Sequence, residues 1–301
     1  MKVLILGSEG FIGKHLVNYY SQKKYQVFGC DIIETPEKKE YSYQKISLLS
    51  SDFSSLFINK KFDLCINASG SGNVSFSMQH PLSDFEANLQ TVIHVLENIK
   101  NHNSNCKFIH ISSAAVYGNP SSLPVSESAE LKPLSPYGWH KYMSELLCVE
   151  YAQIYNLNTA SVRPFSVFGP GLKKQLLWDI SQKINSSTGE IELWGTGKES
   201  RDFIFISDLV DAIDIISEKG NLNGEQYNLA SSVETTVEYI AKKMVSCLNE
   251  TIKIKFNNKV RAGDPLNWKA DLTKVKSLGF TNKMGIDAGI ENYCNWIKSN
   301  N

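Results

Sequence analysis

Three side chains in the middle of the sequence have the types and the spacing needed for proton transfer at an alcohol. Tyr137 and Lys141 stand four residues apart at the start of a helical pattern, which places both on one face of the helix. His140, one residue before Lys141, points off this face. A free tyrosine is a weak acid with a pKa of about 10, but a lysine ammonium one turn away would stabilise the phenolate and lower that pKa. Ser113 leaves the preceding strand and could hydrogen-bond the same substrate oxygen. These residues predict acid–base chemistry at a secondary alcohol.

A glycine-rich turn near the N-terminus predicts a dinucleotide site. The turn follows an apolar run and opens a helical pattern, with G-x-x-G-x-x-G spacing where G-x-G-x-x-G is commoner. Such a turn lets the backbone approach a pyrophosphate at the helix N-terminus. The residues expected to contact the cofactor are Gly7, Gly10, Phe11, Ile12 and Gly13.

Two further positions support this site. Asp31 closes the next strand, near the position where an acid bonds the adenosine ribose, and its charge would repel a 2′-phosphate, so NAD is favoured over NADP. Ala68 follows another strand, where the nicotinamide half of the cofactor would pass. The alternative interpretations are a plain strand-to-helix turn at the glycines, a simple turn at Ala68 and a loop cap at Asp31.

Strand-like and helix-like segments alternate through the first half of the chain. This alternation predicts right-handed βαβ crossovers and an α/β fold with a Rossmann-like, doubly wound parallel sheet. We expect a NAD-binding domain over residues 1–168 and a small, mostly C-terminal substrate-binding lobe over 169–301, interleaved with the last elements of the sheet. The apolar runs lie at 2–6, 26–30, 64–67, 107–111 and 159–162, and the helical patterns at 11–23, 81–100 and 136–155.

The composition excludes several classes of protein. The 31 Lys and Arg residues balance the 31 Asp and Glu residues, which argues against a nucleic-acid binder, because such proteins need a basic surface. No apolar run is long enough for a membrane span, and the N-terminal run is too short for a signal peptide. The six cysteines form no Cys-x-x-Cys pair, so we expect free thiols and a cytoplasmic location. The spacing of the histidines suits no metal site, and we expect no metal.

The ordered set of motifs resembles the extended short-chain dehydrogenase/reductases, in their NAD-dependent nucleotide-sugar epimerase/dehydratase group. The resemblance covers nearly the whole chain. A single Tyr-x-x-x-Lys pair is weak evidence, whereas the complete order is specific. The motifs are the glycine turn, Asp31, Ser112 to Gly118, the Tyr137–Lys141 pair, Arg163-Pro164, Phe168 to Gly171, Gly195 to Gly197, Arg201 to Phe203, Asp208, Arg261 to Asp264, Ala270-Asp271 and Leu278-Gly279.

The resemblance implies catalytic roles, and the sequence departs from the family pattern directly after the catalytic serine. It implies that Ser113 and Tyr137 contact the reacting hydroxyl, and that Lys141 also holds the nicotinamide ribose. Dehydratases of this family carry an acidic pair directly after the catalytic serine or threonine. Here Ala114 and Ala115 occupy those positions, and neither can move a proton, so we do not expect 4,6-dehydration.

The resemblance also implies how the substrate and a second copy of the chain are held. Arg201 and Arg261 would face the diphosphate or nucleotide of a nucleoside-diphosphate sugar, and a guanidinium has forked donors that match phosphate oxygens. A surface ion pair is the alternative for each arginine. Ser166 stands where the family usually has an asparagine near the sugar diphosphate. The helices over 81–100 and 136–155 resemble the pair that forms a four-helix bundle in family homodimers, although their apolar stripes could equally face the core.

These observations favour one function and leave two others open. The leading hypothesis is NAD-dependent epimerisation of a nucleoside-diphosphate sugar at C4, by transient oxidation and re-reduction on the opposite face. An NAD(P)-dependent reductase or dehydrogenase of a nucleotide 4-keto-sugar needs the same three residues. A non-catalytic dinucleotide-sensing protein is the third, but such proteins commonly lose the tyrosine or the lysine. The family suggests synthesis of precursors for cell-surface polysaccharides.

Overall fold

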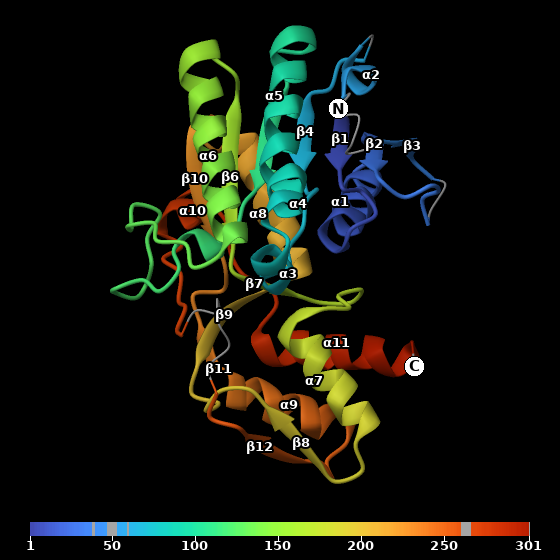
Figure 1. Ribbon diagram of the computed structural model, residues 1–301. Coiled ribbons are helices and arrows are strands. Elements are labelled where there is room, and N and C mark those ends of the chain that lie inside the picture. The colour runs from blue at the N-terminus through green and yellow to red at the C-terminus, as the bar shows by residue number, and fades with distance from the viewer. Residues whose placement is uncertain (38–39, 47–52, 59, 260–265, 301) are drawn as a thin grey trace.

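A seven-stranded parallel sheet forms the centre of the molecule (Figure 1). The computed structural model describes residues 1–37, 40–46, 53–58, 60–259 and 266–300. The strand order is β3-β2-β1-β4-β5-β6-β10, so the direction of winding reverses between β1 and β4. The doubly wound sheet predicted from the sequence is therefore confirmed. The strands are β1 (Lys2–Leu6), β2 (Gln26–Asp31), β3 (Ser42–Lys45), β4 (Leu64–Asn67), β5 (Lys107–Ile111), β6 (Thr159–Pro164) and β10 (Asn223–Leu229).

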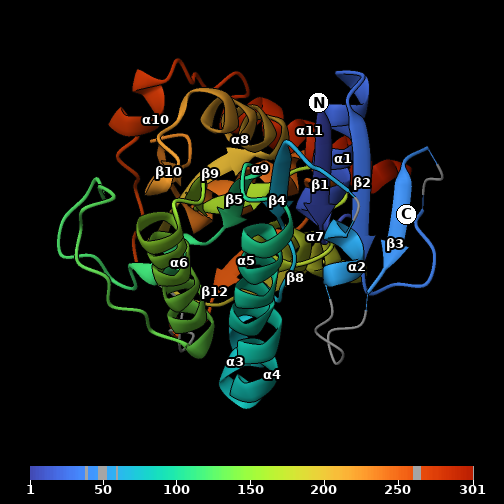
Figure 2. The ribbon, with the colours of Figure 1, turned by 90° about the horizontal axis from the view of Figure 1, so that it is seen from above.

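Helices cover both faces of this sheet, as its nearly continuous apolar strands require. On one face lie α1 (Phe11–Gln22) and α8 (Ile206–Lys219), and on the other α2 (Ser54–Phe57), α5 (Thr91–His102) and α6 (Pro136–Tyr155). Successive residues of β1 alternate between the two: Val3 and Ile5 join the first buried cluster, whereas Leu4 and Leu6 join the second. Figure 2 shows the strands between these two helical layers.

The helix that carries the Tyr137–Lys141 pair begins and ends as its sequence predicts. Ser135 caps the N-terminus of α6, where its side-chain oxygen accepts a hydrogen bond from the backbone N–H of Gly138 at 3.2 Å, and Pro136 occupies the first turn. Asn156 ends the helix in the left-handed conformation, with φ of 55°. This start places Tyr137 in the first turn of α6, directly after the chain has left β5 and a long loop.

The helical pattern over 81–100 is interrupted by a wider turn. It divides into α4 (Pro81–Phe85), a π-helical segment η1 (Glu86–Gln90) and α5, and a short α3 (Val74–Gln79) precedes it. The side-chain N–H of Asn88 donates to the carbonyl and to the carboxylate of Asp84 at 3.2 and 3.1 Å. The Thr91 hydroxyl donates to the carbonyl of Glu86. These hydrogen bonds lie at the π-helical turn, which contains one residue more than a turn of an α-helix. Such π-helical turns are frequent at functional sites.

The second half of the chain builds a smaller lobe beyond the C-terminal ends of the strands (Figure 1). From this half of the chain, α8 and β10 return to the main sheet. The two small sheets of the lobe have the orders β11-β9-β7 and β12-β8. Their strands are β7 (Ser166–Phe168), β8 (Glu190–Leu193), β9 (Ser200–Phe205), β11 (Glu234–Thr236) and β12 (Lys253–Phe256). The helices in this half, besides α8, are α7 (Gln175–Ser186), α9 (Val237–Leu248), α10 (Thr273–Ser277) and α11 (Ile286–Ser299). A short helix in the first half, η2 (Ala114–Val116), follows β5.

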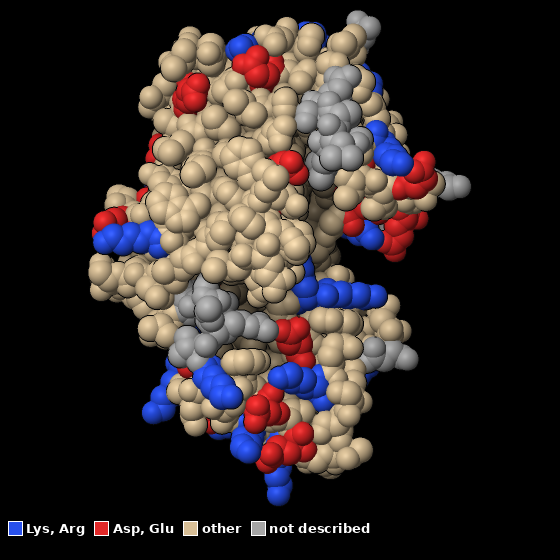
Figure 3. All heavy atoms as spheres, in the orientation of Figure 1, with Lys and Arg blue, Asp and Glu red and all other residues tan. Residues whose placement is uncertain are grey.

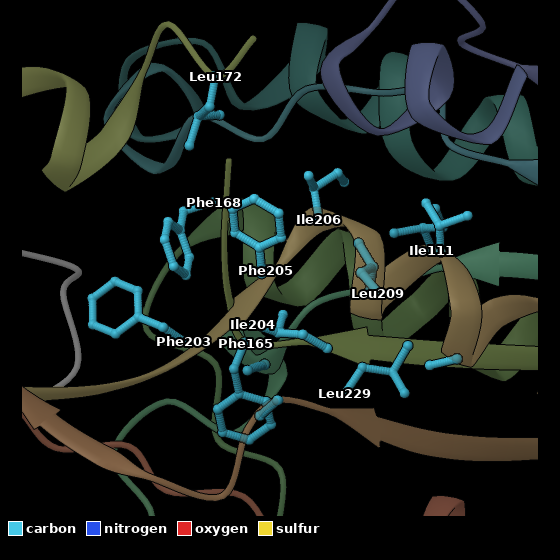
Figure 4. Close-up of a cluster of buried hydrophobic side chains, with 14 of the residues drawn as sticks. Ile111, Phe165, Phe168, Leu172, Phe203, Ile204, Phe205, Ile206, Leu209 and Leu229 are labelled. Atoms are coloured by element: carbon cyan, nitrogen blue, oxygen red, sulfur yellow. The ribbon is translucent and has the colours of Figure 1, made fainter. Parts of the chain in front are cut away.

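One buried cluster runs from the main sheet into the lobe. Figure 4 shows Ile111 and Leu229, from two strands of the main sheet, in the same cluster as Phe168, Phe203 and Phe205 from the lobe. Phe168 contacts the other two rings edge-on, with ring centroids 5.8 and 5.4 Å apart. The lobe is therefore packed against the sheet by apolar contact, which fixes its position relative to the ends of the strands.

Two sequence expectations concern the chain as a whole. All six cysteines are free thiols, and five of them are buried in the structure. Free, buried thiols behave as small apolar residues, as the sequence predicts. In the part of the chain that the structure describes, no helix is both long and apolar enough to span a bilayer.

Candidate active site

The glycine turn brings the backbone of three segments so close together that side chains would not fit. Gly7 has φ of +74°, and a Cβ atom there would lie 2.7 Å from the carbonyl oxygen of Ala68. A Cβ atom on Gly13 would lie 1.9 Å from the carbonyl oxygen of Gly7. Gly10 is exposed at the N-terminus of α1, and among the described side chains none caps that end. The first N–H groups of α1 therefore face outward, as a pyrophosphate-binding turn requires.

The remaining predicted cofactor residues surround this turn. The carboxylate of Asp31 accepts hydrogen bonds from the backbone N–H groups of Glu9 at 2.9 Å and Ile32 at 2.7 Å, so it is fixed beside the turn. The ring of Phe11 lies next to Gly171 of the lobe, where a Cβ atom would be 3.7 Å from the ring. Ile12 packs against the main buried cluster. The turn has room only for glycine, it precedes an exposed helix N-terminus, and an acid is fixed beside it. These three features are typical of a dinucleotide-binding site.

Ser113 and Tyr137 come together at the C-terminal end of β5. Ser113 caps η2, and its hydroxyl oxygen accepts a hydrogen bond from the N–H of Ala115 at 3.1 Å. Its side chain also hydrogen-bonds Tyr137. The backbone N–H of Tyr137 donates to the hydroxyl of Ser77 at 3.2 Å. Tyr137 is thus held between the strand end and α3.

Lys141 is buried one helical turn further along α6. Its ammonium donates to the carbonyl oxygen of Ile111 at 2.9 Å, and only 4% of the residue is exposed. Burial lowers the pKa of Lys141 to about 8, although the carboxylates of Asp84 and Glu145 act in the opposite direction.

The expectation that Lys141 lowers the pKa of Tyr137 is wrong for the protein alone. Burial raises the pKa of Tyr137, and the hydrogen bond with Ser113 only partly offsets this. The physical reason is desolvation, which disfavours the phenolate, while the Lys141 ammonium is directed to a backbone carbonyl. The first-turn N–H groups of α6 and a positively charged nicotinamide ring would both favour the phenolate.

A histidine–carboxylate contact beside these residues has no local signature in the sequence. The ring nitrogen Nδ1 of His140 lies 2.7 Å from the carboxylate of Asp84, which is completely buried. Asp84 raises the pKa of Tyr137 and of Lys141 through its charge. His140 does point away from the catalytic face, as predicted, but its partner comes from α4, 56 residues earlier. Only the three-dimensional packing of α4 on α6 reveals the pair.

Two of the predicted substrate residues, Ser166 and Arg201, lie on strands of the same small sheet. Ser166 begins β7 and is paired with Phe203 of β9. Arg201 lies on β9, where its guanidinium donates to the carbonyls of Ser200 at 2.9 Å and Leu266 at 3.2 Å. The guanidinium also lies 5.8 Å from the centre of the Trp268 ring. Arg261 lies outside the described residues.

A lysine from the lobe reaches toward the main sheet. Lys174 precedes α7, and its ammonium would be 3.4 Å from a Cβ atom on Gly72, in the segment after β4. Its charge contributes to the lowered pKa of Lys141. Figure 3 shows a hollow between the two parts of the molecule, with basic side chains along its lower edge. Within the described ranges, no three His, Cys, Asp or Glu side chains gather in a way that could hold a metal ion.

The glycine turn, the acid Asp31 and the Ser113–Tyr137–Lys141 group are all present in this chain. A comparison with known families gives the same result. A profile described as the NAD dependent epimerase/dehydratase family matches residues 3–230. The chain belongs to this family. The family resemblance inferred from the sequence is therefore confirmed, and the chain is a member of a family of NAD-dependent enzymes.

Relatives within the epimerase/dehydratase family match over almost the whole chain. An uncharacterised UDP-glucose epimerase of Bacillus subtilis (strain 168) is 30% identical and covers 92% of both chains. A putative UDP-glucose 4-epimerase of Methanocaldococcus jannaschii is 28% identical over 99% of both chains. The solved structure of UDP-glucuronic acid 4-epimerase from Bacillus cereus, in complex with UDP-glucuronic acid and NAD, is 26% identical, with a TM-score of 0.89 and full coverage of both chains.

Proposed function

We propose that this protein catalyses NAD-dependent epimerisation of a nucleoside-diphosphate sugar at C4. The observation that carries the proposal is the Ser113–Tyr137–Lys141 group at the end of β5, in a member of the NAD dependent epimerase/dehydratase family. The relatives in Bacillus subtilis and Methanocaldococcus jannaschii, whose names are those of UDP-glucose epimerases, support the substrate class.

The catalytic roles follow from the chemistry of each side chain. Bound NAD supplies a reversible acceptor for the hydrogen and electron pair of the reacting carbon. Tyr137 takes the proton of the hydroxyl and later returns it, and Ser113 orients the same oxygen. Lys141, positioned by the carbonyl of Ile111, holds the nicotinamide ribose and supplies positive charge near the phenolate. Because the sugar ends with the same oxidation state, these residues return to their starting protonation after each turnover.

The residues after Ser113 favour epimerisation over dehydration. Ala114 is completely buried at the start of η2. The carbonyl of Ala115 lies against Gly138, where a Cβ atom would be 2.8 Å away. Neither residue has a side chain that can donate or accept a proton, so the elimination of water lacks its acid and base at this place.

We assign the holding of the substrate to the lobe, residues 169–301, together with Ser166. Arg201 is proposed to contact the diphosphate or the nucleotide, because its forked donors match phosphate oxygens. Arg261 is also proposed to contact the diphosphate or the nucleotide, and this proposal rests only on the motif in which it occurs. Lys174 joins them, since its ammonium lies between the lobe and the segment after β4. The cofactor half of the site is assigned to residues 1–168, through the glycine turn, Asp31 and Ala68.

The proposal is tested by turnover in deuterated water. The purified protein is incubated with UDP-glucose, UDP-glucuronic acid and UDP-N-acetylglucosamine, and products are followed by proton NMR. A C4 epimer that keeps its original hydrogen at C4 is the expected product, because the hydrogen is stored on the cofactor and returned. Deuterium at C4 would overturn this mechanism. Loss of one NADH or NADPH per product from a 4-keto-sugar would instead identify a reductase.

The role of Tyr137 is tested with two matched variants on the same helix. Tyr137→Phe removes only the phenol oxygen and is expected to lower turnover by about 10³-fold, within the range typical for a lost acid–base group. NAD binding, measured as nucleotide released on denaturation, should stay within about twofold. Tyr142→Phe, a partly buried tyrosine on α6, is the control and should keep its activity. Normal turnover of Tyr137→Phe would contradict the proposed role.

We also propose that two copies associate through α5 and α6 as a four-helix bundle. These helices expose large apolar side chains: Leu146 is 49% exposed and Ile154 64% exposed, and Trp139 and Met143 continue the same stripe of α6. Figure 3 shows few charged groups over this part of the molecule. A contiguous apolar surface of this kind marks a site of association. A cytoplasmic location and a part in polysaccharide precursor synthesis are proposed from the family alone.

A further inference from the structure

Glu9 places a carboxylate inside the glycine turn itself. Only 5% of its side chain is exposed. Its carboxylate accepts hydrogen bonds from the Tyr41 hydroxyl and, at 3.1 Å, from the backbone N–H of Glu37. The ring of Tyr41 reaches it by crossing Gly29 of β2, where a Cβ atom would be 2.1 Å from the ring. Glu9 is thus a fixed charge and not a mobile surface group.

The backbone of the residue that carries this carboxylate contacts the acid assigned to the adenosine ribose. The backbone N–H of Glu9 donates to the carboxylate of Asp31 at 2.9 Å, so the two residues are in direct contact. A ribose bound by Asp31 would therefore have its 2′-oxygen close to residue 9. In NADP that oxygen carries a phosphate monoester, with a charge of about −1.5 to −2 at neutral pH.

The neighbouring charges add to the repulsion. In the described part of this group, the ammonium of Lys14 is paired with the carboxylates of Glu37 and, at 3.7 Å, Glu9. Among the described residues of this group, the carboxylates of Glu9, Asp31 and Glu37 outnumber the ammonium of Lys14. Because Lys14 is already paired with these carboxylates, its ammonium is not available to bind a 2′-phosphate.

We propose that Glu9 is a second residue, besides Asp31, that selects NAD against NADP. It repels the 2′-phosphate by its own charge and keeps Lys14 engaged. This inference rests on the proposed role of Asp31 at the adenosine ribose. At partly buried sites, removal of one like charge a few ångströms away changes an affinity by about tenfold or more.

The test is a direct competition between the two dinucleotides. Each protein is equilibrated overnight with equimolar NAD⁺ and NADP⁺ in excess, freed of unbound nucleotide by gel filtration and denatured. The released NAD and NADP are then quantified by mass spectrometry. Glu9→Gln keeps the size of the side chain and can still bond Tyr41. We expect it to shift the bound ratio at least tenfold toward NADP, and Glu9→Gln with Lys14→Gln to lose most of that gain.

Two control variants separate charge from anchoring. Tyr41→Phe breaks a hydrogen bond to Glu9 but leaves its charge, and Glu34→Gln removes an exposed acid of the same loop that is paired with Lys45. Both should keep the wild-type ratio within about twofold. A ratio unchanged in Glu9→Gln, or an equal shift in Tyr41→Phe, would overturn the proposal for Glu9 alone. Wild-type protein that retains neither dinucleotide would overturn the cofactor site as well.

Discussion

Lys141 combines a catalytic assignment with an unfavourable position for a charge. Its pKa falls from 10.5 to about 8 because the ammonium is buried. Between pH 8 and 10.5 the unfolded chain therefore binds more protons than the folded one, so the Lys141 contribution to stability rises with pH over this window. Below pH 8 the full penalty applies, on the order of 3 kcal/mol. Such a cost is typical of residues kept for function and not for stability.

We predict that Lys141→Met abolishes turnover and stabilises the nucleotide-free protein at pH 7. The gain should be about 1–2 kcal/mol, because the bond to the Ile111 carbonyl, worth about 1 kcal/mol, is lost with the charge. The gain should shrink as the pH approaches 10.5. Urea unfolding at several pH values measures it, with Lys173→Met, an exposed lysine, as the control. A destabilised Lys141→Met at pH 7 would mean that the ammonium is not penalised by burial.

The Asp84–His140 pair joins two elements, α4 and α6, at the site. Asp84 is fully buried, so removal of His140 takes away one of the donors to its carboxylate and leaves the side-chain N–H of Asn88. We predict that His140→Leu costs about 1–3 kcal/mol of stability, because a buried carboxylate loses one of its hydrogen-bond donors. Asp84→Asn, which removes the charge, should cost about 1 kcal/mol. In the Asp84→Asn background, His140→Leu should cost at least about 1 kcal/mol less than it does alone, as measured by urea unfolding in a double-mutant cycle. Simple additivity of the two changes would contradict a coupled pair.

The turn between β1 and α1 depends on close backbone contact. Gly13→Ala would set a methyl group 1.9 Å from the carbonyl oxygen of Gly7, although alanine favours a helix by about 1 kcal/mol over glycine. We predict that the clash dominates, with a loss of about 2 kcal/mol of stability and weaker NAD retention. Gly189→Ala is the control, because nothing lies within 4 Å of its Cβ position. Equal stability and retention for the two variants would refute this account of the turn.

Local sequence signals were sufficient for some elements and not for others. The bounds of α6 follow from Ser135 and Pro136 at its start, and β1, β4 and β5 follow from short apolar runs. The strands of the lobe have no comparable local signal, because their pairing joins distant segments, such as Ser166 with Phe203. The Asp84–His140 pair and the raised pKa of Tyr137 depend on burial, which no spacing of residues reveals.

At the scale of the whole molecule, the two parts of the site lie on one packed body. The glycine turn follows β1, the proposed catalytic group follows β5, and Arg201 and Lys174, which are proposed to contact the substrate, come from the lobe. The buried cluster in Figure 4 is continuous between the sheet and the lobe. Apolar packing of this extent makes the lobe a fixed wall of the site, so the distance between the catalytic group and the proposed diphosphate site is set by the fold.

The outer face of α5 and α6 leads to the last prediction, a homodimer. At micromolar concentration we expect sedimentation at twice the chain mass of 33.7 kDa. The double variant Leu146→Glu with Ile154→Glu should sediment as a single chain, because four buried charges in the symmetric interface would be unpaired. Val233→Glu, on an apolar side chain 53% exposed in the lobe, should leave the dimer intact. A wild-type protein of single-chain mass, or a dimer that survives both substitutions on α6, would show that this apolar face serves another purpose.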